Sequence, residues 1–540
     1  MKLRFGAVTT AAVLVLAGTG QAFVGEAFAG HTPTTTYDEQ TQNNTATCVD
    51  GSATSPTDCT GTFPGQIDTV TPDVETPLFD TPGGNVSTED IHRLLYPGST
   101  TKVFAHMMLG FCTPADGSSS PTVPRCNSNV LTNYTSNNDA TAEAQIADVA
   151  RRGIDGVVLD WYAGGSPVDQ AALKVQAAIS RLGYCAGPGH CKVSYVLNYD
   201  GSTLKWPVAA TGIPGTTGDA CPPNADASAL ESCIVARVKN DLCYMNGYHF
   251  GDDAYQRYAL GGGRARPIVT FFVDEGHMFA NLPATGPAPS WADVWTQARA
   301  WSDDLAGSCA VSPYDKDNGS PLLVFENAGG FTHAGGDGAF NWVNPTQDQD
   351  ELRISPETDA GTVDHFYATS KPYADSQLVF GAAYKGFNDT QSAWGARRLI
   401  DQRCGQTWVQ SLASAGKYYS ERHQLPFVQL VTWNDHNEGT SIETGISNCY
   451  TVDAAVDGST LRWNLRASSS DATRATIARF QVFDSTDGAN FRQIASLPDT
   501  RSAMRLDGLA TGTHHLFVKM VGESGFLNQS SPIVTYVSQR

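Results

Sequence analysis

The stretch KVFAHMMLGF, residues 102–111, is the first of a series of short apolar runs that decide the fold. It is dense in aliphatic and aromatic residues and stands out from the polar sequence before it. Runs of this length and composition are typical of strands buried in a parallel sheet. The runs that follow it are GIDGVVLDWY (153–162), CKVSYVLNYD (191–200), PIVTFFVDE (267–275), PLLVFENAG (321–329), VDHFYATS (363–370), SQLVFGAAYKGFND (376–389) and PFVQLVTWNDHNEG (426–439).

Segments with the periodicity of an amphipathic helix separate these runs, because their apolar residues recur at intervals of three and four. The clearest of them are 138–152, 167–183, 290–307 and 407–423. Eight strand–helix units over about 340 residues predict an α/β fold, a (β/α)8 barrel of the TIM type. An open doubly wound sheet is the rival fold. It is less favoured because no glycine-rich phosphate loop follows an early strand, and GGGRAR (261–266) is better explained as a flexible loop.

The barrel domain is predicted at residues 91–449, and the regions that flank it differ from it in composition and pattern. Residues 1–29 combine basic residues, an apolar stretch and an A-x-A cleavage site, which predict a signal peptide and a secreted protein. Residues 30–90 resemble a low-complexity lead-in or linker. Residues 450–540 alternate short strands with Asp-Gly and Thr-Gly turns, which predicts a small all-β sandwich. Its Ser-x-Asp-Gly hairpin resembles that of a fibronectin type III-like module, which implies an accessory role.

The charge of the chain limits its partners. The sequence has 540 residues, with 35 Lys and Arg against 55 Asp and Glu, and a formal net charge of −20. Such an acidic surface repels phosphate, so nucleic acid and anionic membranes are excluded as expected partners. We expect a monomer that acts on a neutral ligand.

Twelve cysteines, an even number, favour disulfides in an oxidising compartment. No C-x-x-C motif pairs with a second one and no H-E-x-x-H motif occurs, so we expect neither a metal nor another cofactor. Three short disulfide loops are candidates: Cys185–Cys191, Cys112–Cys126 and Cys48–Cys59.

Polar and aromatic residues stand at the ends of the predicted strands, where a (β/α)8 barrel gathers its reacting groups. Each of them alone is more readily explained by a strand that ends at the surface. Together they suit a sugar, because rings stack on aromatic side chains, hydroxyls pair with carboxylates and amides, and two carboxyl groups transfer protons. The candidate substrate-binding residues are His106, Asp160, Trp161, Tyr199, Asp200, Glu275, Glu326, Tyr384, Trp433 and Asn434.

Asp435 and Glu438 are the candidate catalytic pair. Their odd spacing would send them to opposite faces of a continuous strand, so they can share one site only if the backbone turns near Asn434. Asn437 and Gly439 permit such a turn. One carboxyl, kept protonated by its neighbour's charge or by an apolar wall such as Trp433, would act as general acid and the other as base. The spacing alone leaves a solvated Asx-rich loop equally open.

Sequence motifs also resemble two glycosidase families. TWNDHNEGTSIE (432–443) resembles the last-strand motif of glycoside hydrolase family 71, the α-1,3-glucanases or mutanases. It is also similar to the Trp-Asn-acid-x-x-Glu-Gly-Thr-x-Ile-Glu motif of family 99, the endo-α-mannosidases and mannanases. The segments 102–111 and 153–161 resemble the first two strands of family 71, and GGFTHAGGDGAFNWV (329–343) is a looser match to its aromatic loop.

The resemblance implies a (β/α)8 glycosidase acting on an α-linked glycan, an endo-α-1,3-glucanase, with Glu438 as general acid. In family 71, Asp435 would be general base to water in an inverting reaction. In family 99, the matching acid assists the sugar's own 2-hydroxyl in a retaining one. TWND favours family 71, whereas EGTSIE favours family 99, and the second strand ends in Asp160 where family 71 typically has Asn.

Two other functions stay open. One is an endo-α-mannanase or mannosidase-like enzyme on another microbial glycan. The other is a non-catalytic glycan-binding protein of the cell surface, built on a degenerate barrel. Serine hydrolysis lacks its motif, because no G-x-S-x-G elbow occurs in the sequence.

Overall fold

The computed structural model describes most of the chain beyond residue 84. The predicted signal peptide, the Cys48–Cys59 and Cys112–Cys126 pairs and Glu275 lie outside the described residues. The described ranges are 85–110, 136–205, 207–222, 226–272, 289–345, 353–354, 356–389 and 398–539, with the backbone of 33–34 and 47–48.

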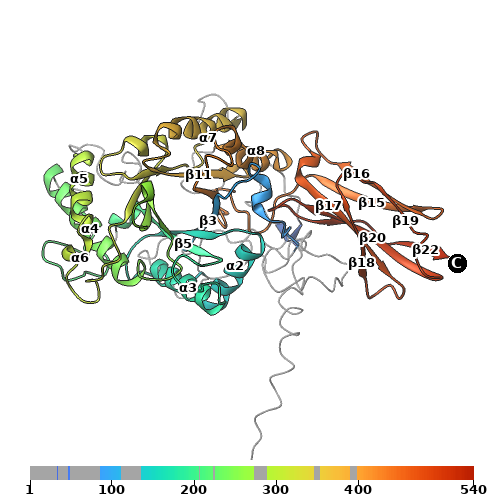
Figure 1. Ribbon diagram of the computed structural model, residues 1–540, viewed down its shortest axis with the longest axis horizontal. Helices are drawn as coiled ribbons and strands as arrows, with labels where there is room; N and C mark the ends of the chain where they lie inside the picture. The colour runs from blue at the N-terminus through green and yellow to red at the C-terminus, as the bar shows by residue number, and fades with distance from the viewer. Residues whose placement is uncertain are drawn as a thin grey trace, which may run out of the picture.

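Eight parallel strands close into a barrel, in which each strand pairs with two neighbours and the last pairs with the first. The predicted (β/α)8 barrel is therefore confirmed, and Figure 1 shows it beside the C-terminal domain. The barrel strands, in order around the ring, are β3 (Lys102–Met108), β4 (Gly156–Trp161), β5 (Ser194–Asp200), β7 (Arg266–Phe272), β8 (Leu322–Glu326), β9 (Gly338–Phe340), β11 (Leu378–Tyr384) and β14 (Phe427–Val431).

Helices cover the outside of the barrel, and five of those described begin at a polar cap residue. The Asn138 side chain, for example, accepts a hydrogen bond from the Thr141 backbone N–H at the start of the first of them. The α-helices are α2 (Asp139–Arg151), α3 (Pro167–Arg181), α4 (Ala227–Tyr248), α5 (Trp291–Ser302), α6 (Leu305–Ser308), α7 (Pro356–Ser370) and α8 (Gln406–Ser414). None of the described helices is long and apolar enough to cross a bilayer.

Short elements fill the connections between strands and helices. They include the 3-10 helices η3 (Ile91–Leu94), η5 (Gly201–Lys205), η6 (Leu260–Gly262), η7 (Ala328–Thr332), η8 (Lys371–Tyr373), η9 (Arg403–Gly405) and η10 (Ala415–Lys417). They also include the two-residue strands β6 (Arg257–Tyr258), β10 (Arg353–Ile354), β12 (Phe387–Asn388) and β13 (Leu399–Ile400). The segment predicted as a flexible loop at 261–266 forms the end of η6 and the approach to β7.

The sixth strand lies elsewhere than predicted. Residues 363–370 form the last two turns of α7, and the sixth barrel strand is the three-residue β9. Val363, Phe366, Tyr367 and Ser370 are buried, which is the i, i+3, i+4, i+7 spacing of one helix face. The β-branched and aromatic residues of this run therefore lie in a helix. The prediction of a strand at 363–370, which rested on the composition of the run, is wrong.

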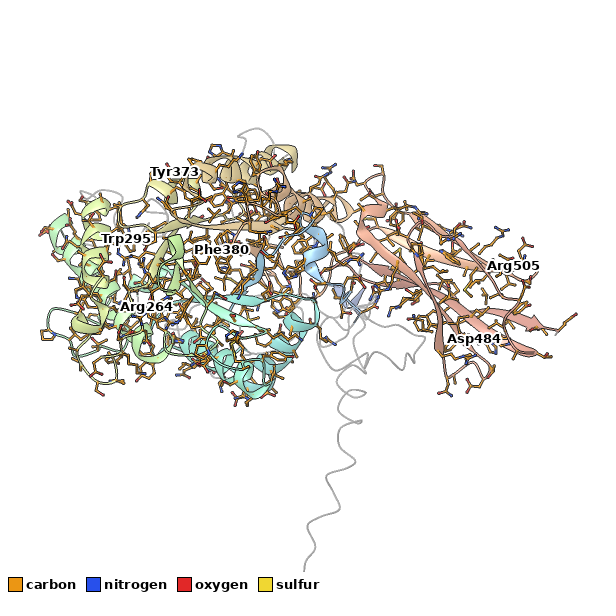
Figure 2. The ribbon with its side chains drawn as sticks, in the orientation of Figure 1. Arg264, Trp295, Tyr373, Phe380, Asp484 and Arg505 are labelled. Carbon is orange, nitrogen blue, oxygen red and sulfur yellow. A yellow bond between two sulfur atoms is a disulfide. The ribbon has the colours of Figure 1, made fainter. Side chains whose placement is uncertain are left out.

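Two hydrophobic cores divide the barrel domain. One fills the lumen of the barrel, and the other lies between the strands and the helices. Figure 2 labels a member of each, Phe380 of the lumen and Trp295 of the outer layer. Because side chains alternate along a strand, neighbouring residues mostly belong to different cores, although Ala382, Ala383 and Tyr384 at the end of β11 all belong to the outer one. The lumen core consists of Phe104, Val158, Val196, Ile268, Leu322, Val324, Phe340, Leu378, Phe380 and Phe427.

After the last barrel strand the chain forms two antiparallel sheets that share one core. The predicted β domain is therefore confirmed. Its likeness to a fibronectin type III module stays a prediction. No helix stands between Val431 and Tyr450, a stretch that is described throughout. The strands are β15 (Tyr450–Asp457), β16 (Thr460–Ala467), β17 (Ile477–Ser485), β18 (Arg492–Pro498), β19 (Ala503–Arg505), β20 (Gly512–Gly522), β21 (Gln529–Ser530) and β22 (Val534–Ser538). The 3-10 turn η11 (Arg474–Thr476) precedes β17.

The sandwich packs directly on the barrel domain. The blue segment that contains η3 lies between the two in Figure 1. Residues 85–90, placed by the sequence in the lead-in, are folded there, and the Ser87 backbone N–H donates to the Phe526 carbonyl at 2.7 Å.

Four disulfides join the described cysteines. The predicted Cys185–Cys191 loop is confirmed. The other three pairs are Cys221–Cys233, Cys243–Cys309 and Cys404–Cys449, of which the last links the segment before α8 to the start of the sandwich.

Candidate active site

The motif at 432–443 forms a compact turn at the end of β14, which stops at Val431. The Asp435 Oδ1 atom accepts hydrogen bonds from the backbone N–H groups of Asn437 at 2.9 Å and Glu438 at 3.0 Å. This is the local side-chain capping that favours Asp in turns. The backbone thus leaves the strand as the odd spacing requires, and Asp435 and Glu438 lie on one short turn.

Contacts on both sides fix this turn. The Thr432 hydroxyl oxygen accepts a hydrogen bond from the Asp435 backbone N–H at 2.8 Å. Gly439 has a φ of 63°, a left-handed conformation that disfavours other residues. Its backbone also lies close to Asn388 of β12, whose N–H donates to the Glu438 carbonyl at 2.7 Å. The candidate catalytic pair, Asp435 and Glu438, therefore lies on a loop with contacts on both sides.

The motif holds three carboxylates in different surroundings. Asp435 is 3 % exposed and Glu438 is partly exposed, whereas Glu443 is fully buried with its Oε1 atom 2.7 Å from His436 Nε2. Burial lowers the pKa of nearby Lys385 to about 7, and the charge of Glu443 acts in the opposite direction. Glu438 is thus the carboxylate of the motif best placed to reach a ligand.

Four of the predicted binding residues face the barrel lumen. They are His106, Asp160, Asp200 and Glu326, and each lies an even number of positions after a lumen-core residue on its own strand. All four stand at or near the carboxyl ends of their strands, which is the end where the 432–443 turn begins. The structure therefore brings together most of the predicted carboxylates.

A hydrogen-bonded chain fixes Asp160 across three strands. The Asn198 Nδ2 atom donates to Asp160 Oδ1 at 3.3 Å, and the Thr270 hydroxyl donates to Asn198 Oδ1 at 2.8 Å. The three residues are register partners on β4, β5 and β7. Thr270 was not among the predicted residues, although it lies two positions after the lumen residue Ile268 and so on the same face of β7.

Aromatic side chains line the lumen beside His106. The ring of Trp342 lies 4.6 Å from that of His106 and 4.6 Å from that of Phe272, measured between centroids. Both Trp342 and Phe272 are partly exposed. The His106 Nδ1 atom lies 3.3 Å from Gln429 Oε1, which holds the imidazole toward this group. Partly exposed rings next to carboxylates are the surface on which a sugar face can stack.

Three predicted binding residues lie outside the lumen, in the layer between the strands and the helices. The Trp161 indole N–H donates to Asp169 of α3 at 2.8 Å, and the Tyr199 hydroxyl donates to Asp241 of α4 at 2.9 Å. Both follow a lumen-facing residue by one position, and alternation along the strand turns them toward the helices. Burial raises the pKa of Tyr199 well above its usual value. Trp433 is also fully buried, against α2.

The remaining predicted residues have other placements. Asn434 joins the turn to β3, because its Oδ1 accepts from the Met108 N–H at 2.8 Å and its Nδ2 donates to the Met108 carbonyl at 3.0 Å. Tyr384 is 1 % exposed at the end of β11, where its backbone N–H donates to Ser411 Oγ at 3.1 Å. Among the residues described, no group of three His, Cys, Asp or Glu side chains is arranged to hold a metal ion.

Trp342 gives a direct test of the lumen surface. Replacing Trp342 with Ala should raise KM by about tenfold on the true substrate, since the stacking surface is removed while the carboxylates stay in place. The control is Trp161→Phe, in the outer layer, which should lower the melting temperature and leave KM unchanged. Steady-state kinetics of both variants measure the difference. An unchanged KM for Trp342→Ala would place the sugar elsewhere.

Comparisons with known proteins add little to this geometry. No protein-family model matches the chain, and no curated protein sequence matches it. One similar solved structure is a family 99 endo-α-mannosidase from Bacteroides thetaiotaomicron, with 12 % identity over 64 % of this chain and 87 % of that chain and a TM-score of 0.39. A second is a glycoside hydrolase-like protein, with 14 % identity over 64 % of this chain and 88 % of that chain and a TM-score of 0.42. A third is an endo-β-1,4-mannanase from Thermotoga petrophila, with 10 % identity over 84 % of this chain and 94 % of that chain and a TM-score of 0.22. With scores this low, these likenesses carry no weight for the function.

Proposed function

We propose that this protein is a glycoside hydrolase that cleaves an α-linked polysaccharide. The observation that carries the proposal is the turn at 435–438, which presents two carboxylates at the carboxyl end of the barrel. Three further carboxylates, Asp160, Asp200 and Glu326, face the lumen of the same barrel, and partly exposed aromatic rings stand among its lumen residues. This combination suits the recognition and proton transfer that a glycosidic bond requires.

The two carboxylates take different roles. Glu438, the more exposed of the pair, donates a proton to the glycosidic oxygen as the bond from this oxygen to the anomeric carbon breaks. Asp435 accepts the proton of the water that attacks the anomeric carbon from the opposite face, which yields the inverted product. The alternative is that Asp435 assists the sugar's 2-hydroxyl, and the product then keeps its configuration.

The proposed substrate is an α-1,3-glucan, cut internally. This rests on the resemblance of TWND, and of the segments 102–111 and 153–161, to family 71. An α-mannan is the second candidate, because EGTSIE matches the family 99 pattern. We also propose that the protein is secreted, since the four disulfides between described cysteines suit an oxidising compartment.

A panel of polysaccharides tests the proposal. Purified full-length protein should release reducing sugar from α-1,3-glucan or α-mannan and leave β-glucan and β-mannan intact. NMR of the first-formed anomer then separates inversion from retention. Binding to a polysaccharide without turnover across the whole panel would instead support a non-catalytic glycan-binding protein.

A further inference from the structure

The segment that follows the catalytic turn is held from the barrel side by one arginine. Arg152, the C-cap of α2, is 1 % exposed, and its guanidinium lies 4.7 Å from the centre of the Trp433 ring. Its Nη1 donates to the Ile442 carbonyl at 2.9 Å and its Nη2 to the Glu443 carbonyl at 2.7 Å. A planar, rigid donor group of this kind fixes two backbone carbonyls at once.

The same segment is held on its other side by the β-sandwich. A loop between β20 and β21 pairs with it, since the Ile446 N–H donates to the Gly525 carbonyl at 2.9 Å and the Leu527 N–H to the Ile446 carbonyl at 3.0 Å. Phe526, between these two, is fully buried in the core that the helices and the barrel share. The sandwich thus contributes a side chain to the core of the barrel domain.

Phe526 fits closely against the end of the barrel. A Cβ atom added to Gly405, which precedes α8, would lie 2.0 Å from the Phe526 ring. Next to it, the Trp408 indole N–H donates to the Ser524 carbonyl at 2.9 Å. A regular (β/α)8 fold has a helix after its last strand, whereas here the chain passes from β14 to the sandwich without one.

The contact of Phe526 with the barrel domain is called the anchor here. Backbone hydrogen bonds connect it to the candidate site. The Glu443 N–H donates to the Trp433 carbonyl at 2.9 Å, and the Thr440 N–H donates to the Asp435 carbonyl at 3.1 Å. Ile446 is only three residues beyond Glu443. A shift at the contact with the sandwich is therefore transmitted through a few bonded residues to the turn that carries both carboxylates.

We infer that the β-sandwich is a positioning part of the candidate active site and not a detachable accessory module. Phe526 is a positioning residue that acts through the segment 440–446, with Arg152 as its counterpart on the barrel side. The inference about catalysis rests on the proposed function. Because a misplacement of about 1 Å in a catalytic group can cost about 100-fold in rate, loss of this anchor should reduce turnover more than substrate binding.

The test compares Phe526→Ala with Phe491→Ala in the full-length protein. Phe491 is 2 % exposed and packs on Phe517 in a separate cluster, on the hairpin that also carries Asp484. Figure 2 shows Asp484 on the part of the sandwich away from the barrel. Phe491→Ala thus damages the sandwich without touching the anchor. Phe526→Leu, which keeps most of the apolar volume, serves as the conservative variant.

Two measurements are made for each variant. Phe526→Ala should lower kcat by on the order of tenfold or more with KM within about twofold, and should speed amide hydrogen exchange across residues 432–446. Phe526→Leu should restore much of kcat. Phe491→Ala should lower the melting temperature while kcat and the exchange of 432–446 stay as in the wild type.

The inference is overturned if kcat and exchange at 432–446 are the same in Phe526→Ala as in the wild type, or if Phe491→Ala changes both to the same extent. The exchange measurement needs no substrate. If the wild type hydrolyses no glycan, the proposed function fails, and the exchange of the three variants still decides whether the sandwich holds the turn.

Discussion

Replacing Glu438 with Gln should lower kcat on the polysaccharide substrate by about three orders of magnitude. The amide is of similar size and keeps the hydrogen-bonding shape of the side chain, but it has no proton to give to the leaving oxygen. General acid catalysis of this kind contributes about 10²–10⁴-fold. The measurement is steady-state release of reducing sugar by the wild type and the variant, with far-UV circular dichroism to show that both are folded.

The leaving group provides the internal control for this role. A glycosyl substrate whose leaving group is already a weak base, such as fluoride, needs little protonation, so Glu438→Gln should lose much less activity on it. Equal losses on both substrates would mean that Glu438 acts otherwise than as the acid.

Asp435→Asn tests the partner role on the same turn. The Asn side-chain oxygen can still accept from the N–H groups of Asn437 and Glu438, so the turn should keep its shape while the base is lost. We expect a loss of similar size, and this one should persist with the activated leaving group, because water or the 2-hydroxyl still needs a base. Activity close to that of the wild type in either variant would show that the pair is not catalytic.

The sequence was sufficient to predict the barrel but not every strand in it. Six of its strands fall within apolar runs that the sequence marks, and β7 starts one residue before its run, because buried parallel strands leave a continuous apolar signal. The sixth, Gly338–Phe340, has three residues and begins with glycine, so it leaves almost no signal. The run at 363–370 has the stronger strand signal in its composition, although Val363, Phe366 and Tyr367 already show helical spacing.

The sequence places the candidate residues at strand ends but does not give the orientation of their side chains. Asp160 and Trp161 are adjacent on one strand, as are Tyr199 and Asp200, and an extended backbone cannot turn both members of such a pair into the lumen. Alternate residues along β4, counted from the lumen residue Val158, include Asp160 and leave out Trp161. Strand-end position alone carries no such information.

Other contacts of the candidate site could not be predicted from the sequence. Trp342 follows a strand too short to recognise, and its contacts with His106 and Phe272 join segments far apart in the chain. Likewise, the burial of Glu443 beside His436 depends on how the turn folds back, which its spacing does not reveal. Such tertiary pairings become visible only once the barrel is closed.

Replacing Arg152 with Ala should lower the free energy of unfolding of the barrel domain by about 3 kcal/mol. The buried guanidinium pairs with Asp148 at 2.5 Å and satisfies the carbonyls of Ile442 and Glu443. Its removal leaves a buried carboxylate with less compensation and two carbonyls without this donor, and the breaking of a buried pair costs about 3–5 kcal/mol. Thermal and urea unfolding of the two proteins measure the change.

The neighbouring Arg151 supplies the matched control. It pairs with the same Asp148 carboxylate, at 2.7 Å, but its side chain is 37 % exposed. Water competes for an exposed pair, so Arg151→Ala should cost only about 0–1 kcal/mol. If the two variants lose equal stability, the ion pair with Asp148 is the common cause and the contacts with the carbonyls of Ile442 and Glu443 contribute little. A larger loss for Arg152→Ala alone means that the energy lies in the buried contacts of Arg152, which are the pair with Asp148 and the two carbonyls behind the turn that carries the proposed acid and base.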